Sequence, residues 1–113
     1  MKEALTILLA DTSEQLGQMA QDALAEQNIN VILCEKDGQS VLDAICNYAP
    51  DAVLVDAFMA KLDAQALKRT FDTLPKEKVK SRKTVFFAMG NFDSPEMEFD
   101  LIEAGFRYYF LKP

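Results

Sequence analysis

The chain has 113 residues, half of them hydrophobic, and a net charge of −6 at pH 7. This length and apolar content are typical of one globular domain, spanning residues 1–113, and they exclude a second packed domain. The negative charge argues against direct binding to nucleic-acid phosphates, and no apolar run approaches the roughly 20 residues that span a bilayer. Because the sequence also opens without a signal-peptide profile, we expect a cytosolic protein without membrane contact.

The sequence carries few residues of the kinds that bind zinc or form disulfides. Its only cysteines, Cys34 and Cys46, do not form a CxxC pair, and histidine is absent. Neither a zinc site nor a disulfide framework is therefore predicted. We interpret both cysteines as small hydrophobic residues of the core.

The first half of the chain alternates between strand-like and helix-like patterns. Residues 5–10 form an apolar run that ends at Asp11, and Thr12 begins a capping-box pattern followed by apolar residues at helical spacing. Residues 30–34 predict a second strand, and Asp37 opens a second helix. The chain therefore repeats the order strand, polar residue, helix.

A short apolar run at residues 52–55 stops at Asp56. This pattern is typical of a strand that is buried on both faces and carries a carboxylate at its carboxyl end, where chemistry is located in open α/β sheets. A lone aspartate at such a position is more often a loop residue or the cap of the next helix. Asp56 is therefore a candidate functional residue only if other polar or charged side chains are predicted to lie close to it.

The second half of the chain repeats the alternation of helices and strands. Its one charge run, residues 76–83, has no apolar period and is interpreted as a solvated connection, with a docking patch for an acidic partner as the alternative. Ser94 followed by proline predicts a helix start, and Gly105 predicts its end. The helices are expected at residues 64–71 and 94–104, and the strands at residues 85–89 and 107–111.

Five strands alternating with four helices predict an α/β fold with a flavodoxin-like, doubly wound parallel sheet in the order 2-1-3-4-5. Asp11, Asp56 and Lys112 each follow a strand directly. Because the carboxyl ends of parallel strands meet at one edge of a sheet, we expect these three side chains to converge in one cleft. We also expect Asp56 to be accessible there, with Lys112 near it. Such convergence is more specific than any single residue.

These segments resemble the receiver domain of bacterial two-component response regulators. The resemblance is carried by Ala10-Asp11, by residues 51–63 and by residues 109–113, and it covers the whole chain. Within that family the pattern is most similar to the receivers of the stage zero sporulation protein A type. The resemblance implies a signalling module rather than an enzyme, and a longer transcription regulator whose fifth helix and DNA-binding domain lie outside this sequence.

The resemblance also implies roles for individual residues. Asp56 matches the carboxylate that accepts a phosphoryl group from a histidine kinase or phosphotransferase, in a phosphorelay that is sporulation-related in the most similar receivers. Asp11, Asp56 and the backbone carbonyl of Phe58 match the ligands of Mg²⁺, and Lys112 matches the lysine that contacts phosphoryl oxygens.

Two departures from the family pattern affect these roles. Thr12 stands where the family has a second carboxylate, so Mg²⁺ binding is expected to be weak or absent. The hydroxyl residue that signals phosphorylation falls at Met89 or Gly90, neither of which has a hydroxyl. Tyr109 matches the aromatic partner in this switch, but an ordinary half-buried aromatic is the alternative. The competing function is a pseudo-receiver, which is never phosphorylated and acts by dimerisation or partner binding.

The helix at 94–104 carries more apolar side chains than one buried stripe needs, and a receiver without its fifth helix leaves part of the sheet uncovered. We therefore expect a homodimer formed through this helix, the last strand or the uncovered sheet face. The residues expected at this contact are Phe99, Ile102, Phe106 and Tyr108.

Overall fold

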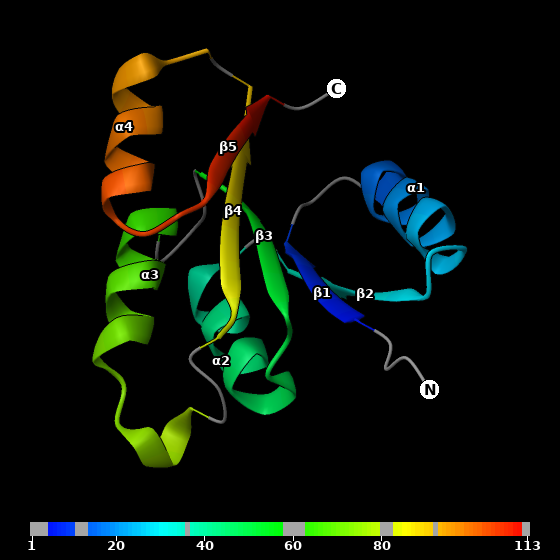
Figure 1. The fold of residues 1–113 in the computed structure, drawn as a ribbon, viewed down its shortest axis with the longest axis horizontal. Coiled ribbons are helices and arrows are strands. Elements are labelled where there is room, and N and C mark those ends of the chain that lie inside the picture. Colours follow the sequence, from blue (N-terminus) through cyan, green and yellow to red (C-terminus); the bar gives the residue numbers. More distant parts are fainter. Residues whose placement is uncertain are drawn as a thin grey trace.

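The computed structural model contains one five-stranded parallel sheet in the order β2-β1-β3-β4-β5, which confirms the predicted topology (Figure 1). The structure describes residues 5–10, 14–35, 37–57, 63–79, 83–91 and 93–111, with the backbone alone for residues 14–16 and 76. The strands are β1 (Leu5–Ala10), β2 (Ile29–Cys34), β3 (Ala52–Asp56), β4 (Val85–Gly90) and β5 (Tyr108–Leu111). The helices are α1 (Glu14–Ala25), α2 (Gly38–Tyr48), α3 (Ala64–Thr73) and α4 (Pro95–Glu103), with a 3₁₀ turn at Lys76–Lys78.

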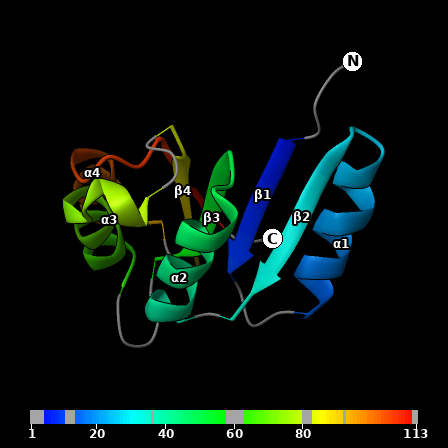
Figure 2. The same ribbon diagram turned by 90° about the horizontal axis from the view of Figure 1, so that it is seen from below.

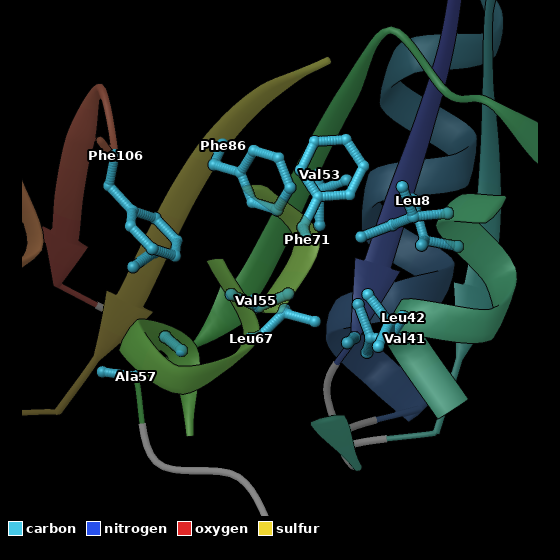
Figure 3. Close-up of a cluster of buried hydrophobic side chains, with 14 of the residues drawn as sticks. Leu8, Val41, Leu42, Val53, Val55, Ala57, Leu67, Phe71, Phe86 and Phe106 are labelled. Atoms are coloured by element: carbon cyan, nitrogen blue, oxygen red, sulfur yellow. The ribbon is translucent and has the colours of Figure 1, made fainter. Parts of the chain in front are cut away.

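The helices lie on both faces of the sheet. Alternate strand residues such as Leu8, Val53 and Phe86 pack with α2, α3 and α4 on what we call the three-helix face (Figure 3). On the opposite face, Gly17 of α1 lies against Leu33 of β2. Figure 2 shows α1 beside β2 and apart from the other helices. Among the described residues, no helix covers β3, β4 and β5 on this second face, which we call the open face.

Phe86 of β4 occupies the centre of the core on the three-helix face. Its ring centroid lies 5.2 Å from that of Phe71 and 5.7 Å from that of Phe106, in tilted and edge-on geometries (Figure 3). The ammonium of Lys68 lies 5.4 Å from the Phe86 centroid and forms a 2.7 Å ion pair with Asp72. Lys68 therefore covers the edge of the core with its stem while its charge remains paired.

Hydrogen bonds tie the amino ends of three strands together around Asp51. Its backbone N–H donates to the Thr6 carbonyl at 2.9 Å, and its carboxylate accepts from the Thr6 N–H at 2.8 Å. The Asp51 carbonyl accepts from the Val85 N–H at 3.0 Å, and the Thr84 hydroxyl donates to the Pro50 carbonyl at 2.7 Å. β3 is thereby fixed between β1 and β4 before its apolar run begins.

Local sequence signals account for most helix ends. The side chains of Asp37, Asp63 and Ser94 accept backbone N–H groups at the starts of α2, α3 and α4. Gly105 follows α4 with a φ of 109°, a left-handed conformation that favours glycine, as its predicted role as a helix stop requires. None of the helices in the described part of the chain is long and apolar enough to cross a membrane.

The structure corrects the expected position of Phe106. Its side chain is only 2 % exposed and contacts Phe86, so it belongs to the core and is not available as a contact between molecules. The reason is the turn after α4, where the Phe106 N–H donates to the Leu101 carbonyl and directs the chain back over the sheet.

Both cysteines are free and partly buried, and Cys34 packs against the core as expected. Burial raises the pKa of the Cys34 thiol above its ordinary value, with further contributions from the nearby carboxylates of Glu35, Asp37 and Asp43. Cys34 is therefore a poor nucleophile at neutral pH.

Candidate functional site

The candidate site lies at the carboxyl edge of the sheet, where β3 ends at Asp56. β3 is paired with β1 on one side and with β4 on the other, so Asp56 stands at the point where the strand order reverses. The other expected members of the site, Asp11, Phe58 and Lys112, lie outside the described residues, as does Thr12. The expected convergence of Asp11, Asp56 and Lys112 therefore stays a prediction.

Asp56 is buried, which contradicts the expectation that its carboxylate would be accessible. Asp56 is 3 % exposed, and among the described residues it is the one charged residue that is buried. Strand pairing continues beyond this residue: Asp56 is in register with Met89, and the N–H of Ala57 donates to the Met89 carbonyl at 2.8 Å. The backbone of Asp56 thus lies within the hydrogen-bonded ladder and not past its end.

Asp56 is not the cap of the following helix. That role belongs to Asp63, whose carboxylate accepts the N–H of Ala66 at 2.8 Å at the start of α3. Burying a carboxylate is costly when it serves only to fill space, because its charged form loses solvation. The structure therefore removes one of the two ordinary explanations for an aspartate at this position.

Most of the expected metal site lies outside the described residues. Within the described ranges, no group of three or more cysteine, aspartate and glutamate side chains is arranged to hold a metal ion. Of the expected Mg²⁺ ligands, only Asp56 belongs to those ranges. Its carboxylate oxygens are the type of donor that Mg²⁺ prefers.

A groove of about 280 Å³ lies beside the candidate site, between α3 and α4. Ala57, the residue after Asp56, forms part of its wall, and three carboxylates line it: Asp63 before α3, and Glu96 and Asp100 on α4. This groove was not predicted from the sequence. Glu96 and Asp100 are four residues apart, so the sequence places them on the same side of one helix. This spacing does not show which neighbouring helix they face.

Tyr109 of β5 lies across the end of β4 on the three-helix face. Gly90, at this end, faces the Tyr109 ring: a β-carbon added to Gly90 would overlap the hydroxyl oxygen and lie 3.1 Å from two ring carbons. Met89 points to the opposite face, as the alternation along β4 requires. Of the two positions that the sequence left open, Gly90 is therefore the one that contacts Tyr109.

The position of the Tyr109 ring should depend on residue 90 being a glycine, which has no side chain. We predict that Gly90→Ala displaces the Tyr109 ring and lowers the free energy of unfolding by about 1–3 kcal/mol, the usual cost of overpacking. Urea denaturation of the wild type, Gly90→Ala, Tyr109→Leu and the double variant measures this. The penalty of Gly90→Ala should shrink in the Tyr109→Leu background. Additive losses would show that the two residues do not interact.

Comparison with solved structures identifies the fold. No family model matches the sequence. A two-component response regulator from Clostridium difficile superimposes with a TM-score of 0.80 at 16% identity, covering 96% of this chain and 84% of that one. The receiver domain of the Francisella response regulator 1452 gives 0.77 at 23% identity, with 96% and 84% covered.

A third structure, the BeF3-activated N-terminal receiver domain of RstA from Klebsiella pneumoniae, gives a TM-score of 0.75 at 19% identity, covering 96% of this chain and 87% of that one. Sequence identities this low carry information about the fold alone. The chain has the flavodoxin-like fold of response-regulator receiver domains, with Asp56 at the end of its third strand.

Proposed function

We propose that the chain is a receiver module that accepts a phosphoryl group on Asp56. The observation that carries this proposal is a single buried carboxylate at the carboxyl end of the central strand, at the switch point of a receiver fold. Asp63, and not Asp56, caps the next helix, so capping does not explain the residue. In this role the chain is a signal acceptor and not an enzyme that turns over a substrate.

In the proposed reaction a carboxylate oxygen of Asp56 attacks the phosphorus of a phosphorylated histidine on a kinase or phosphotransferase. A P–O bond forms, the P–N bond breaks, and the imidazole leaves with its electron pair. Mg²⁺, when bound, would neutralise charge on the phosphoryl oxygens. Asp11, Asp56 and the Phe58 carbonyl would hold it, and Lys112 would contact the transferred group.

The burial of Asp56 has a consequence for the rate of this reaction. Asp56 is only 3 % exposed, so in-line approach of a donor to its carboxylate would require neighbouring atoms to move. We therefore expect phosphorylation to be slow with small donors, and to be faster with a protein donor whose binding energy opens the site. The RstA receiver, which has a similar fold, was solved in a BeF3-activated form, and BeF3 is an analogue of the phosphoryl group.

The proposed module would regulate transcription within a phosphorelay. Its charge of −6 disfavours direct contact with DNA, so DNA binding would require a further domain. The similarity of residues 51–63 and 109–113 to the sporulation regulators favours a sporulation-related output.

Acetyl phosphate treatment tests the proposal. We predict that the chain, incubated with acetyl phosphate and Mg²⁺, gains the mass of one phosphoryl group at Asp56, as measured by intact mass spectrometry. Asp56→Asn should abolish the gain. Asp63→Asn is the matched control, because asparagine still caps α3 and the Asp56 carboxylate is retained.

A chain that stays unmodified by acetyl phosphate and by a panel of phosphorylated phosphotransferases would favour the alternative function, a pseudo-receiver that acts by binding alone. The absence of a hydroxyl at both Met89 and Gly90 supports this alternative, since the family's switch uses one. Equal labelling of wild type and Asp56→Asn would place the chemistry on another residue.

Thr12→Asp should strengthen Mg²⁺ binding. Two unit charges about 4 Å apart interact by about 4 kcal/mol at an effective dielectric constant near 20, so a restored carboxylate is expected to lower the Kd for Mg²⁺ by about tenfold or more. Isothermal titration calorimetry measures the change. Thr73→Asp, at the exposed end of α3, adds the same charge elsewhere and should leave the Kd unchanged. Equal affinities of wild type and Thr12→Asp would contradict this assignment.

We further propose that the chain forms a homodimer through its open face. Three aromatic rings gather there: the centroid of Phe110 lies 6.0 Å from that of Phe87 and 5.8 Å from that of Tyr108. Tyr108 is 62% exposed and Phe110 is 48% exposed. Exposed aromatic clusters of this kind are typical of contact surfaces, and association would remove them from water.

Light scattering over a concentration series tests this proposal. We predict a dimer at high micromolar concentration, without phosphorylation, because the surface is exposed in the unmodified chain. The double variant Tyr108→Ser/Phe110→Ser should be monomeric at the same concentration, whereas Phe99→Ser on α4 should remain dimeric. A strictly monomeric wild type would contradict constitutive association, and dimerisation only after acetyl phosphate treatment would indicate an ordinary phosphorylation switch.

A further inference from the structure

β2 forms one edge of the sheet, and no strand of the described chain pairs with its outer side. The order β2-β1-β3-β4-β5 gives β2 a partner, β1, on one side only. All six residues of β2 are uncharged, and none of them is proline. Charged side chains and proline are the usual means by which an edge strand is kept from pairing with another chain. This edge therefore needs protection of another kind.

The pairing register shows which backbone groups of β2 lie on this outer side. Thr6 of β1 turns its N–H and C=O toward β3, where both form hydrogen bonds with Asp51. Backbone groups alternate in direction along a strand, so Ile7 turns toward β2, where it is in register with Val31. In a parallel pair Ile7 bonds to the residues on either side of Val31, so the backbone groups of Val31 itself point outward. We call the outward N–H and C=O groups the β2 edge; they belong to Ile29, Val31 and Leu33.

Gln21 of α1 occupies the middle of the β2 edge. Its side-chain amide donates to the Val31 carbonyl at 3.2 Å, in a partly buried hydrogen bond. Helical spacing puts Gln21 on the same side of α1 as Gly17 and Leu24, and this side faces the sheet. A polar side chain that is turned away from solvent needs such a partner. With Gln21 in place, the central carbonyl of the β2 edge is already bonded and covered.

Little apolar packing holds α1 on the sheet. Within residues 17–25, no side chain belongs to the core cluster, whereas α2 buries four residues and α3 buries three. Figure 2 shows α1 beside β2 and apart from the other helices. Gly17 lets α1 lie close to the strand, because a β-carbon at this position would be 3.0 Å from a methyl carbon of Leu33. An element with so few buried apolar contacts opens at a lower free-energy cost than the whole domain.

We infer that the β2 edge is a strand-pairing surface for a second copy of the chain, and that α1 keeps it closed. When α1 detaches, two β2 edges can pair as antiparallel strands about a two-fold axis at Val31. Ile29 of one copy then lies opposite Leu33 of the other, and the two Val31 residues lie opposite each other. In this register every outward N–H and C=O group of both strands has a partner, and no charge on β2 opposes the pairing. The edge thus matches itself, which is why the occupant is a second copy.

This association is separate from the functions proposed above. It does not require phosphorylation of Asp56, and it does not use the open face, which belongs to β3, β4 and β5. The two kinds of self-association protect different backbone N–H groups from exchange with solvent. A measurement that resolves single residues therefore distinguishes them.

Hydrogen–deuterium exchange of the 113-residue chain, followed residue by residue by NMR over a concentration series, tests the inference. Gln21→Ala removes the side-chain donor and should raise the population with α1 detached by about three- to tenfold, the effect of one hydrogen bond. Because both copies must open, the N–H groups of Ile29, Val31 and Leu33 should become protected at concentrations about tenfold or more below those that the wild type needs. The N–H groups of Asn30 and Ile32, which face β1, should be protected at every concentration.

Two further variants serve as controls. Gln18→Ala also removes a glutamine from α1, but the Gln18 amide donates to Asp22 at the helix surface at 2.9 Å, so this variant should behave like the wild type. Val31→Pro in the Gln21→Ala background removes the central outward N–H, which β1 does not use. It should abolish the concentration-dependent protection of Ile29 and Leu33. Circular dichroism checks that each variant is folded.

The same concentration dependence in the wild type, Gln18→Ala and Gln21→Ala would overturn the inference. Protection of the β2 edge that does not vary with concentration would also overturn it, because the pairing would then lie within one molecule. Faster exchange throughout β2 without concentration-dependent protection would show that Gln21 only stabilises the strand, and would exclude the pairing surface. Protection confined to Tyr108–Leu111 would overturn the inference as well, and would leave the proposed open-face homodimer intact.

Discussion

The pairing of β3 with β1 and β4 is the constraint on which the rest of the structure depends. β3 has a paired strand on each edge, and helices cover the face that carries Val53 and Val55. Both valine side chains are therefore fully buried. Because β3 cannot shift along its neighbours without exposing these side chains, the position of Asp56 is fixed by the same packing. The backbone of Asp56 is held in the ladder by the same pairing.

The order of helices and strands could be predicted from the sequence because strand and helix patterns differ in period. Each helix end was predicted from residues close to it in the chain. Ser94 and Gly105 marked the ends of α4 by chemistry that does not depend on the rest of the fold. The length of the pairing around Asp56 was not predictable in this way. The ladder continues past Asp56 through a hydrogen bond from Ala57 to Met89, two residues that are 32 positions apart, and no local pattern encodes how far a ladder continues.

Phe106 and Phe99 show the same limit for side chains. Phe99 lies in the middle of α4 and Phe106 follows its end, and both were expected at a contact between molecules. Phe106 enters the core because the turn at Gly105 directs it toward Phe86, whereas Phe99 stays outside because Leu101 already occupies the inward side of the helix. The sequence indicated more apolar side chains around α4 than one buried stripe needs. Only the tertiary packing determines which of these side chains stay exposed.

The hydrogen bonds around Asp51 also affect how the chain folds. The bond from Thr6 to the Asp51 carboxylate closes a loop of 45 residues, and the bond from Thr84 to Pro50 closes one of 34. Closing such loops costs conformational entropy before the contacts compensate for it, so sheets built from distant segments fold more slowly than helical bundles. The amino edge of this sheet requires β1, β3 and β4 together, which couples the two halves of the chain into one cooperative folding unit.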